Sequence, residues 1–422
     1  MSMVESLLEK VYIPKFVKVR QNFPDEHIPA QQIPEAVRQA LSRSEISETI
    51  RPGMRICLTC GSRGIDNIVA ITAAVAAFCA ERGAKPFAIP AMGSHGGATA
   101  EGQRSVLRSL GITEETIGCP ILSSMETVCI GTTEEGQPVY IDRHAAEADG
   151  IIVINRIKPH TSFRGTYESG LMKMMAIGLG KQRGAETCHA DGFLQMHRMV
   201  PLFGKGVLKH AKVLFGLGLL ENAFDHTASI HALTPEQIIA EEPVLLRKAF
   251  ELMPSIGFES CDVLVVDQIG KNISGCGMDP NISGVFATPG VTGGIQAQRR
   301  CILSLTPQTH GNGYGMGAAD AITRRLFDSL DLDQIYPNSI TSTSLGFSKI
   351  PIIMPNDRAA IALCIRTCNG IDKSAPRIIR IRNTLALAEM EISEACIPML
   401  GKNMEILTEP YELPFDTEGN LL

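Results

Sequence analysis

The sequence has no tryptophan, few aromatic residues and no long uninterrupted hydrophobic run. No stretch approaches the roughly 18 apolar residues that a membrane-spanning helix needs, so we expect no membrane partner. The 39 lysine and arginine residues are outnumbered by 45 aspartate and glutamate residues. This leaves no basic surplus for phosphates, which argues against nucleic acid as the main partner. The N-terminal residues also lack the apolar core of a secretory signal peptide, and we therefore expect a cytoplasmic protein.

The twelve cysteines are scattered along the chain and do not have the spacing of a four-ligand zinc site. Cys57 and Cys60 lie three apart in a segment typical of a buried strand, where they would point to opposite faces and could not share a metal ion. Cys364 and Cys368 are spaced for one face of a helix, but two thiols do not complete a site. We interpret the cysteines as small core residues.

Strand-like and helix-like segments alternate along the chain, which is typical of an α/β fold. The strands predicted in the first half are 55–60, 85–91, 150–155 and 212–217. The predicted helices are 67–82, 99–111 and one that begins near Thr234, where a capping residue precedes a proline. A fresh strand at 262–270 opens a second set of strands and helices.

This change near residue 256 predicts two α/β domains with the active site in the cleft between them. Residues 1–255 would form the N-terminal domain, and residues 256–397 a C-terminal domain that contributes substrate-binding loops. We expect the tail, about 398–422, to pack back on the N-terminal domain.

Four loops that follow predicted strands combine glycine with histidine, arginine or lysine: 61–64, 92–97, 156–170 and 268–281. Ligands of α/β proteins bind at the carboxyl ends of the strands, so several such loops are expected to meet at one site. A single glycine-rich turn would only indicate a chain reversal.

Two of these loops carry a histidine. His95 lies between glycines in G-S-H-G-G, and His160 follows a proline in K-P-H. A single loop histidine is more often a hydrogen-bonded surface residue than a catalyst. Two together suit an enzyme that inverts a stereocentre, because such an enzyme must handle a proton on both faces of its substrate.

Lys173 lies in an apolar run, S-G-L-M-K-M-M, and His189 follows sixteen residues later. Such a lysine either extends its ammonium group out of an apolar surface or is kept there as a nucleophile, since desolvation lowers the pKa of an amine. His189 could be a metal ligand, although on its own it is more readily read as a hydrogen-bonded loop residue.

Together, G-S-H-G-G-A-T, K-P-H, S-G-x-x-K and the histidine sixteen residues later resemble the nickel-dependent lactate racemase family, the nickel-pincer nucleotide enzymes. The resemblance implies that Lys173, in a motif with Ser169 and Gly170, is joined as a thioamide to a nickel-pincer cofactor of the pyridinium-3,5-bisthiocarboxylic acid mononucleotide type. It implies that His189 is the protein ligand of the nickel, whose square-planar geometry suits soft sulfur and carbon donors.

The same resemblance implies that His95 and His160 are the catalytic acid/base pair. The expected substrate-binding residues are Arg63, Gln268, Lys271 and His310. The implied activity is that of a racemase or epimerase: the C2 hydride of a 2-hydroxy acid moves to the cofactor and returns to the other face. The expected partners are this small molecule and, transiently, the proteins that make the cofactor. The oligomeric state is left open.

Several departures from the family pattern touch the expected pocket. The first loop reads C-G-S-R-G where the family has D-x-T-R-P, His160 and Lys173 are three residues further apart than in the lactate enzyme, and Leu171 replaces a usual glycine. The loops 309–315 and 338–345 are rich in hydroxyl and amide groups, which either shape turns or bind substrate oxygens. We expect a substrate larger or more polar than lactate.

Two alternatives belong to other classes of protein. The first is a zinc-dependent hydrolase or lyase that uses His95, His160 and His189 as ligands, since three imidazoles and a water form a common catalytic site. The second is a non-catalytic homologue that binds a ligand. Replacement of Lys173 by alanine separates these alternatives, because only the racemase should lose both nickel and activity.

Overall fold

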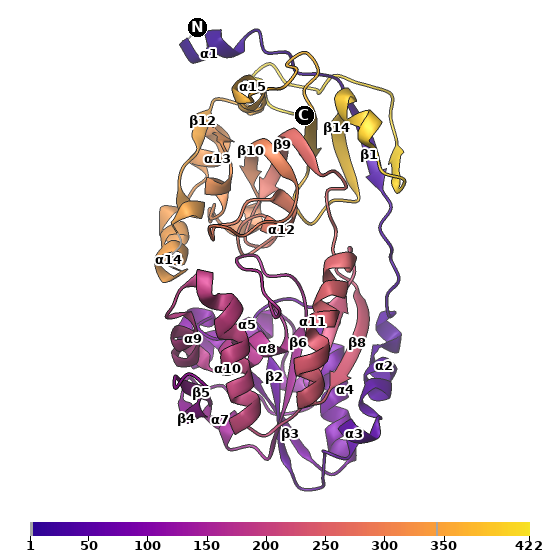
Figure 1. Cartoon of the computed structure of the whole chain (residues 1–422), viewed down its shortest axis with the longest axis vertical. Coiled ribbons are helices and arrows are strands. Elements are labelled where there is room, and N and C mark those ends of the chain that lie inside the picture. Colours follow the sequence, from indigo (N-terminus) through magenta and orange to yellow (C-terminus); the bar gives the residue numbers. More distant parts are fainter. Residues whose placement is uncertain (1–2, 343–344) are drawn as a thin grey trace. The chain divides into compact units, whose positions relative to one another are not determined.

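The computed structural model describes residues 3–342 and 345–422, and the chain divides into two compact units (Figure 1). The inner unit is Pro24–Met253, and the terminal unit combines Met1–Phe23 with Pro254–Leu422. Both are mixed α/β structures, as the sequence predicts.

The first 23 residues belong with the C-terminal part of the chain, which corrects the prediction that 1–255 form one domain. The reason is strand pairing: β1 (Phe16–Gln21) pairs antiparallel with β14 (Glu389–Ser393) and with β15 (Met404–Ile406). The tail 398–422 likewise packs within the terminal unit, where Tyr411 bridges to Phe16, and it is not part of the inner unit. The sequence near Phe16 gives no indication of partners almost 400 residues away.

The inner unit is built on a sheet with the strand order β3-β2-β6-β7-β8. The pairs are parallel except for β7 with β8. The strands are β2 (Arg55–Cys60), β3 (Lys85–Pro90), β6 (Gly150–Arg156), β7 (Val213–Glu221) and β8 (Thr227–Leu233). A separate hairpin of β4 (Thr127–Thr132) and β5 (Pro138–Asp142) has no counterpart in the sequence prediction.

Helices cover both faces of this sheet, and each face has its own apolar cluster. One cluster takes side chains from α8, α9, α10 and α11, and the other takes them from α2 and α4. The helices are α2 (Ile33–Leu41), α3 (Ser44–Ser47), α4 (Ile68–Glu81), α5 (Ala100–Ser109), α6 (Glu114–Ile117), α7 (Arg143–Ala146), α8 (Leu171–Lys173), α9 (Lys181–His189), α10 (Met196–His210) and α11 (Pro235–Leu252). Thr234 caps α11 through a reciprocal pair of hydrogen bonds with Gln237, which confirms the helix start predicted from the sequence.

The terminal unit is built on a second sheet with the strand order β12-β11-β10-β9-β13-β14-β1-β15. The remaining strands are β9 (Ser260–Ile269), β10 (Gln296–Leu305), β11 (Ala321–Thr323), β12 (Ile352–Met354) and β13 (Ile378–Ile381). The helices are α1 (Met3–Leu8), α12 (Pro280–Ser283), α13 (Arg324–Asp328), α14 (Leu332–Ser342) and α15 (Asp357–Thr367). The predicted polar loop 338–345 is partly wrong, because 338–342 belong to α14; residues 343–344 lie outside the described part of the chain.

All twelve cysteines lie in the described part of the chain and are free thiols. Cys57, Cys60, Cys364 and Cys368 are buried, as expected for small core residues. Among residues 3–342 and 345–422, no helix is long and apolar enough to cross a membrane.

Candidate functional site

The glycine-containing loops of the inner unit follow the carboxyl ends of three parallel strands of its sheet. The loops begin after Cys60 of β2, Pro90 of β3 and Arg156 of β6, and β2 lies between the other two strands. After β2 the chain forms β3 on one side of it and later β6 on its other side, so the strand order reverses at β2. In α/β sheets the crevice at such a switch point is where ligands bind.

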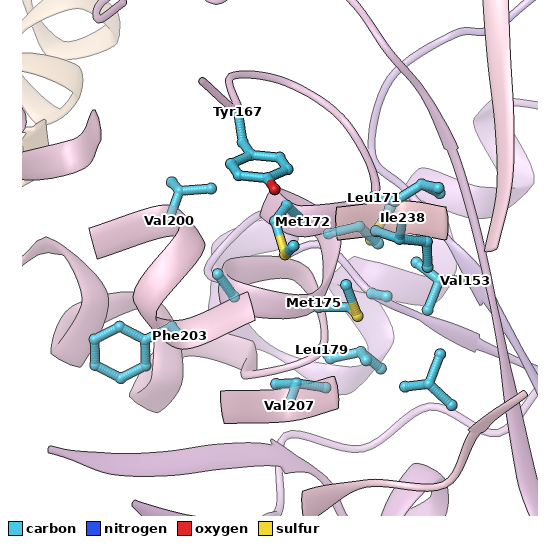
Figure 2. Close-up of a cluster of buried hydrophobic side chains, with 14 of the residues drawn as sticks. Val153, Tyr167, Leu171, Met172, Met175, Leu179, Val200, Phe203, Val207 and Ile238 are labelled. Carbon is cyan, nitrogen blue, oxygen red and sulfur yellow. The ribbon is translucent and has the colours of Figure 1, made fainter. Parts of the chain in front are cut away.

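The residues next to Lys173 in the sequence are apolar and buried. Leu171, Met172 and Met175 are fully buried, and Figure 2 shows them within the cluster formed with α10 and α11. Lys173 is partly exposed and is followed by a π-helical turn, Met174–Gly178. Single π-helical turns are rare and occur frequently at functional sites. The apolar neighbours thus fix the backbone and leave the amine to face the loops.

The amine of Lys173 contacts the ring of His160, with a distance of 2.7 Å from Nζ to Nε2. The other ring nitrogen, Nδ1, accepts a hydrogen bond from the backbone N–H of Ser162 at 3.0 Å. Because Nδ1 accepts, this pattern assigns the proton of the neutral ring to Nε2. The Nε2–H group then donates to Lys173, which must offer a lone pair. This hydrogen bond forms when the amine is neutral, which is also its nucleophilic form.

The surroundings increase the neutral fraction of both groups. Burial, and next the guanidinium of Arg63, lower the pKa of Lys173 from 10.5 to about 8. Burial, and next the ammonium of Lys173, hold the pKa of His160 well below its usual value of 6.5. A lysine whose pKa approaches the ambient pH has a far larger neutral fraction than an exposed one.

His189 ends α9 with one ring nitrogen already engaged. Its Nδ1 lies 2.6 Å from the carbonyl oxygen of Ala185, to which the Nδ1–H group donates. This bond leaves the lone pair on Nε2, the arrangement found in most metal-binding histidines. Burial is the largest cause that lowers the pKa of His189, so the ring stays neutral. Phe193 packs its ring edge-on against the imidazole.

His95 lies in a tight loop whose shape requires glycine. Gly96 has a φ of +66°, and a Cβ atom there would lie 2.6 Å from the backbone of Gly102 and Gln103. The His95 side chain still reaches solvent. Desolvation by the surrounding protein is the largest cause that lowers the pKa of His95, followed by the positive charges of Arg63 and Lys173. Together they lower this pKa from 6.5 to about 4.

The sequence-predicted residues of the inner unit are thus close enough to act on one another electrostatically. The interacting pairs are His95 with Arg63, His95 with Lys173, Lys173 with Arg63, His160 with His189 and His189 with Lys173. Ser169 and Gly170 of the lysine motif lead into α8, and Ser169 pairs with Lys158 through two backbone hydrogen bonds.

A buried ion pair beneath the site was missed by the sequence analysis. The Nζ atom of Lys181 lies 3.1 Å from Oδ2 of Asp142, and both side chains are fully buried. Lys181 also donates to Oε1 of Gln103 at 3.1 Å. The amide nitrogen of Gln103 in turn donates to the carbonyl oxygens of Gly93, at 2.8 Å, and His95, at 3.2 Å. This network joins the start of the helix that carries His189 to the loop that carries His95.

Glu242 of α11 was missed as well. It is almost fully buried, and its Oε2 accepts a hydrogen bond from the backbone N–H of Met172 at 3.0 Å. It caps α8, whose own N-cap residue, Gly170, has no side chain. The reason for glycine is also evident, because a Cβ at Gly170 would lie 2.1 Å from Oε1 of Glu242.

Only a weak sequence signal could have found these two groups. For Lys181 this signal is its place in the glycine-rich run G-L-G-K-Q-R-G. The structure gives it a positive φ of 52°, which is unusual for lysine. Glu242 follows another glutamate, Glu241, which is exposed, and nothing in the sequence distinguishes the buried member of the pair.

Leu171, which stands where the resembled family has glycine, is accommodated by glycines of β7. A Cβ at Gly216 would lie 2.7 Å from Cδ1 of Leu171, and a Cβ at Gly218 would lie 3.7 Å from the same atom. The strand therefore makes room for the larger side chain.

The predicted substrate residues Gln268, Lys271 and His310 belong to the terminal unit. Gln268 is the penultimate residue of β9. The ammonium of Lys271 donates to the carbonyl of Gly275 at 2.7 Å and lies 4.2 Å from the centre of the Tyr314 ring. His310 is exposed in a left-handed conformation.

The polar groups of the loop 309–315 mainly hold the loop itself. The hydroxyl of Thr309 donates to the carbonyl of Asn312 at 2.8 Å, and the side chain of Asn312 donates to the carbonyl of Gln334 at 2.7 Å. Their role in turn structure weakens the expectation that this loop is free to bind a polyhydroxylated substrate.

Comparison with known proteins agrees with the residue pattern. Residues 6–200 match the family model of the lactate racemase N-terminal domain, which confirms the predicted resemblance over this part of the chain. Among solved structures, the chain is similar to the lactate racemase apoprotein from Thermoanaerobacterium thermosaccharolyticum, with 11% sequence identity and a TM-score of 0.45 over 82% of this chain and 99% of that chain. No curated protein matches the sequence.

Proposed function

We propose that the protein is an isomerase that inverts the C2 stereocentre of a 2-hydroxy acid, because residues 6–200 match the family model of the lactate racemase N-terminal domain. The observation that carries the proposal is the contact between Lys173 and His160. Covalent attachment of a cofactor to lysine requires a neutral amine, and a pKa lowered to about 8 beside an imidazole makes this form far more abundant than in an exposed lysine.

The donor set fits the nickel-pincer cofactor of the family. Lys173 would hold the cofactor as a thioamide, and His189 would bind the nickel through Nε2, which the bond from Nδ1 to Ala185 leaves available. When bound, the cofactor would supply the hydride chemistry. The chain's own part is to orient the substrate and to move the hydroxyl proton.

His95 and His160 are the proposed acid/base pair. Both have pKa values lowered below 6.5, so both rings are neutral at neutral pH, the state from which one histidine can accept the hydroxyl proton and the other can donate one. A thioamide nitrogen at Lys173 would not be basic and would not accept the hydrogen bond from Nε2–H of His160. This N–H group would then be available to the substrate.

The substrate is proposed to be larger or more polar than lactate. This rests on the absence of tryptophan, which the resembled lactate enzyme has near its substrate, and on the three additional residues between His160 and Lys173. Glu168 anchors that segment by accepting hydrogen bonds from the backbone N–H groups of His160, at 2.7 Å, and Gly165, at 3.2 Å. Arg63, Gln268, Lys271 and His310 are proposed to bind the substrate's carboxylate and hydroxyl groups.

The zinc alternative has less support. Among the described residues, the groups of three or more histidine, cysteine or acidic side chains whose ligand atoms lie within 4.8 Å of one another do not include His95, His160 and His189. Both ring nitrogens of His160 are also engaged, one by Ser162 and one by Lys173.

A panel assay tests the proposed reaction. The protein, produced together with cofactor-making enzymes, is incubated with single enantiomers of lactate and of longer or hydroxylated 2-hydroxy acids, and chiral chromatography follows the appearance of the other enantiomer. Lys173→Arg keeps the charge but cannot form the thioamide, so it should abolish inversion. Lys205→Arg, on the exposed face of α10, is the matched control and should retain activity.

Two results would contradict the proposal. Inversion of no 2-hydroxy acid, or equal inversion by the Lys173→Arg variant, would exclude the proposed reaction. A kcat/KM for lactate above those of all other acids would contradict only the proposed substrate class.

A further inference from the structure

A second group of metal-ligand side chains lies in the inner unit outside the site described above. It consists of Asp25, His27 and His226, whose ligand atoms all lie within 4.8 Å of one another. Asp25 and His27 follow the point where the chain enters the inner unit at Pro24, and His226 lies in the turn between β7 and β8. None of the three belongs to the loops around Lys173.

Both imidazoles face the same carboxylate oxygen. Nδ1 of His226 lies 3.0 Å from Oδ1 of Asp25, and Nδ1 of His27 lies 3.3 Å from it. The nearer partner of His27 Nδ1 is the backbone carbonyl oxygen of Asp25, at 2.7 Å. In a tetrahedral site with metal–ligand bonds of about 2.0 Å, neighbouring ligand atoms lie about 3.3 Å apart. The two distances therefore already match two edges of such a site. The ring centres of the histidines are 4.6 Å apart.

The ligands are held in place by a buried asparagine. Asn222 donates from its amide nitrogen to Oδ1 of Asp25 at 3.0 Å, and its amide oxygen accepts from the backbone N–H of His226 at 3.1 Å. A backbone hydrogen bond of 2.8 Å from Ile28 to Thr227 joins the two ligand-bearing segments. Such supporting bonds orient the ligands of a metal site before the ion arrives.

We propose that Asp25, His27 and His226 bind a divalent ion of the zinc class, with water in the remaining coordination position. Two imidazoles and one carboxylate are a donor set that zinc accepts readily. In the bound state each ring carries its proton on Nε2 and offers the lone pair of Nδ1, so the cation replaces the hydrogen bonds from His226 to Oδ1 and from His27 to the backbone carbonyl of Asp25. The ion clamps the entering segment to the turn between β7 and β8.

The test uses cofactor-free protein that carries His189→Gln, so that neither the pincer cofactor nor its nickel ligand contributes. Isothermal titration with zinc chloride should give one bound ion per chain. The added variants His27→Gln, His226→Gln and Asp25→Asn should each weaken binding by at least about ten-fold. His197→Gln, another exposed histidine, is the matched control and should leave binding unchanged.

Circular dichroism and the zinc-free Tm should be the same for all of these proteins, which separates loss of ligands from loss of fold. Crystals soaked in zinc should give an anomalous peak between the three side chains. The proposal is overturned if the parent binds no zinc at about 100 µM, or if the three ligand variants bind as the parent does. Because Lys173 chemistry has no part in the assay, this result is independent of the proposed isomerase activity.

Discussion

Replacement of Glu242 by glutamine tests how the lysine-bearing helix is held. Burial raises the pKa of Glu242 from 4.5 to about 8, and the backbone N–H groups of Leu171 and Met172 offset only part of that effect. Its Oε1 has no hydrogen-bond partner among the described residues. The carboxyl group is therefore neutral in the folded protein at pH 7 and is negatively charged once the chain unfolds.

The sign of the pH effect follows from the raised pKa. The contribution to stability is fully present below pH 4.5 and is lost as the pH rises to about 8. Integration of the linkage relation between these two pKa values gives a loss of about 4 kcal/mol in the free energy of unfolding from pH 5 to pH 9. Glutamine keeps an oxygen acceptor for Met172 and has no charge to bury, so the variant should lack this loss.

Urea unfolding at pH 5, 7 and 9, followed by circular dichroism, measures the difference. At pH 5 the variant should be less stable than the parent by about 1 kcal/mol, because its amide N–H groups lack acceptors. At pH 9 it should be the more stable protein. Equal changes of unfolding free energy with pH in both proteins would refute the assignment of a neutral, buried Glu242.

Three further predictions concern the same region. Gly170→Ala places a Cβ 2.1 Å from Oε1 of Glu242 and should lower the free energy of unfolding in urea by about 2 kcal/mol or more. The control Gly64→Ala, with no atom within 4 Å of the new Cβ, should change it by less than about 0.5 kcal/mol. Equal changes in the two variants would contradict the contact. Gln103→Leu removes three hydrogen bonds and should lower the unfolding free energy by about 2–4 kcal/mol. It should also lower kcat by a larger factor than it changes KM. An unaltered kcat would show that the network does not position the His95 loop. In cofactor-free protein, acylation of Lys173 measured by peptide mass should reach its half-maximal rate near pH 8, and a midpoint near 10.5 would contradict the lowered pKa.

The sequence predicts the inner sheet well because local signals agree there. Strands β2, β3 and β6 and the helix that begins after Thr234 are marked by apolar runs and capping residues. The same patterns identify which loops leave the strand ends, and so which side chains of the inner unit meet.

Long-range pairing and burial of single charged groups could not be predicted. The pairing of β1 with β14 joins residues about 370 positions apart, such as Phe16 and Ser393, and no local pattern encodes such a partner. Lys181 and Glu242 look like ordinary surface residues because charge normally indicates exposure. Only the three-dimensional structure reveals that they support the loop of His95 and the helix of Lys173.

The covalent state of Lys173 tests the central claim most directly. Protein produced together with cofactor-making enzymes is digested, the peptide that contains Lys173 is mapped by mass spectrometry, and nickel is measured in the intact protein. We predict a nucleotide-sized mass increment on Lys173 and nickel that is lost in the His189→Ala variant. An unmodified Lys173 without nickel under these conditions would contradict the account.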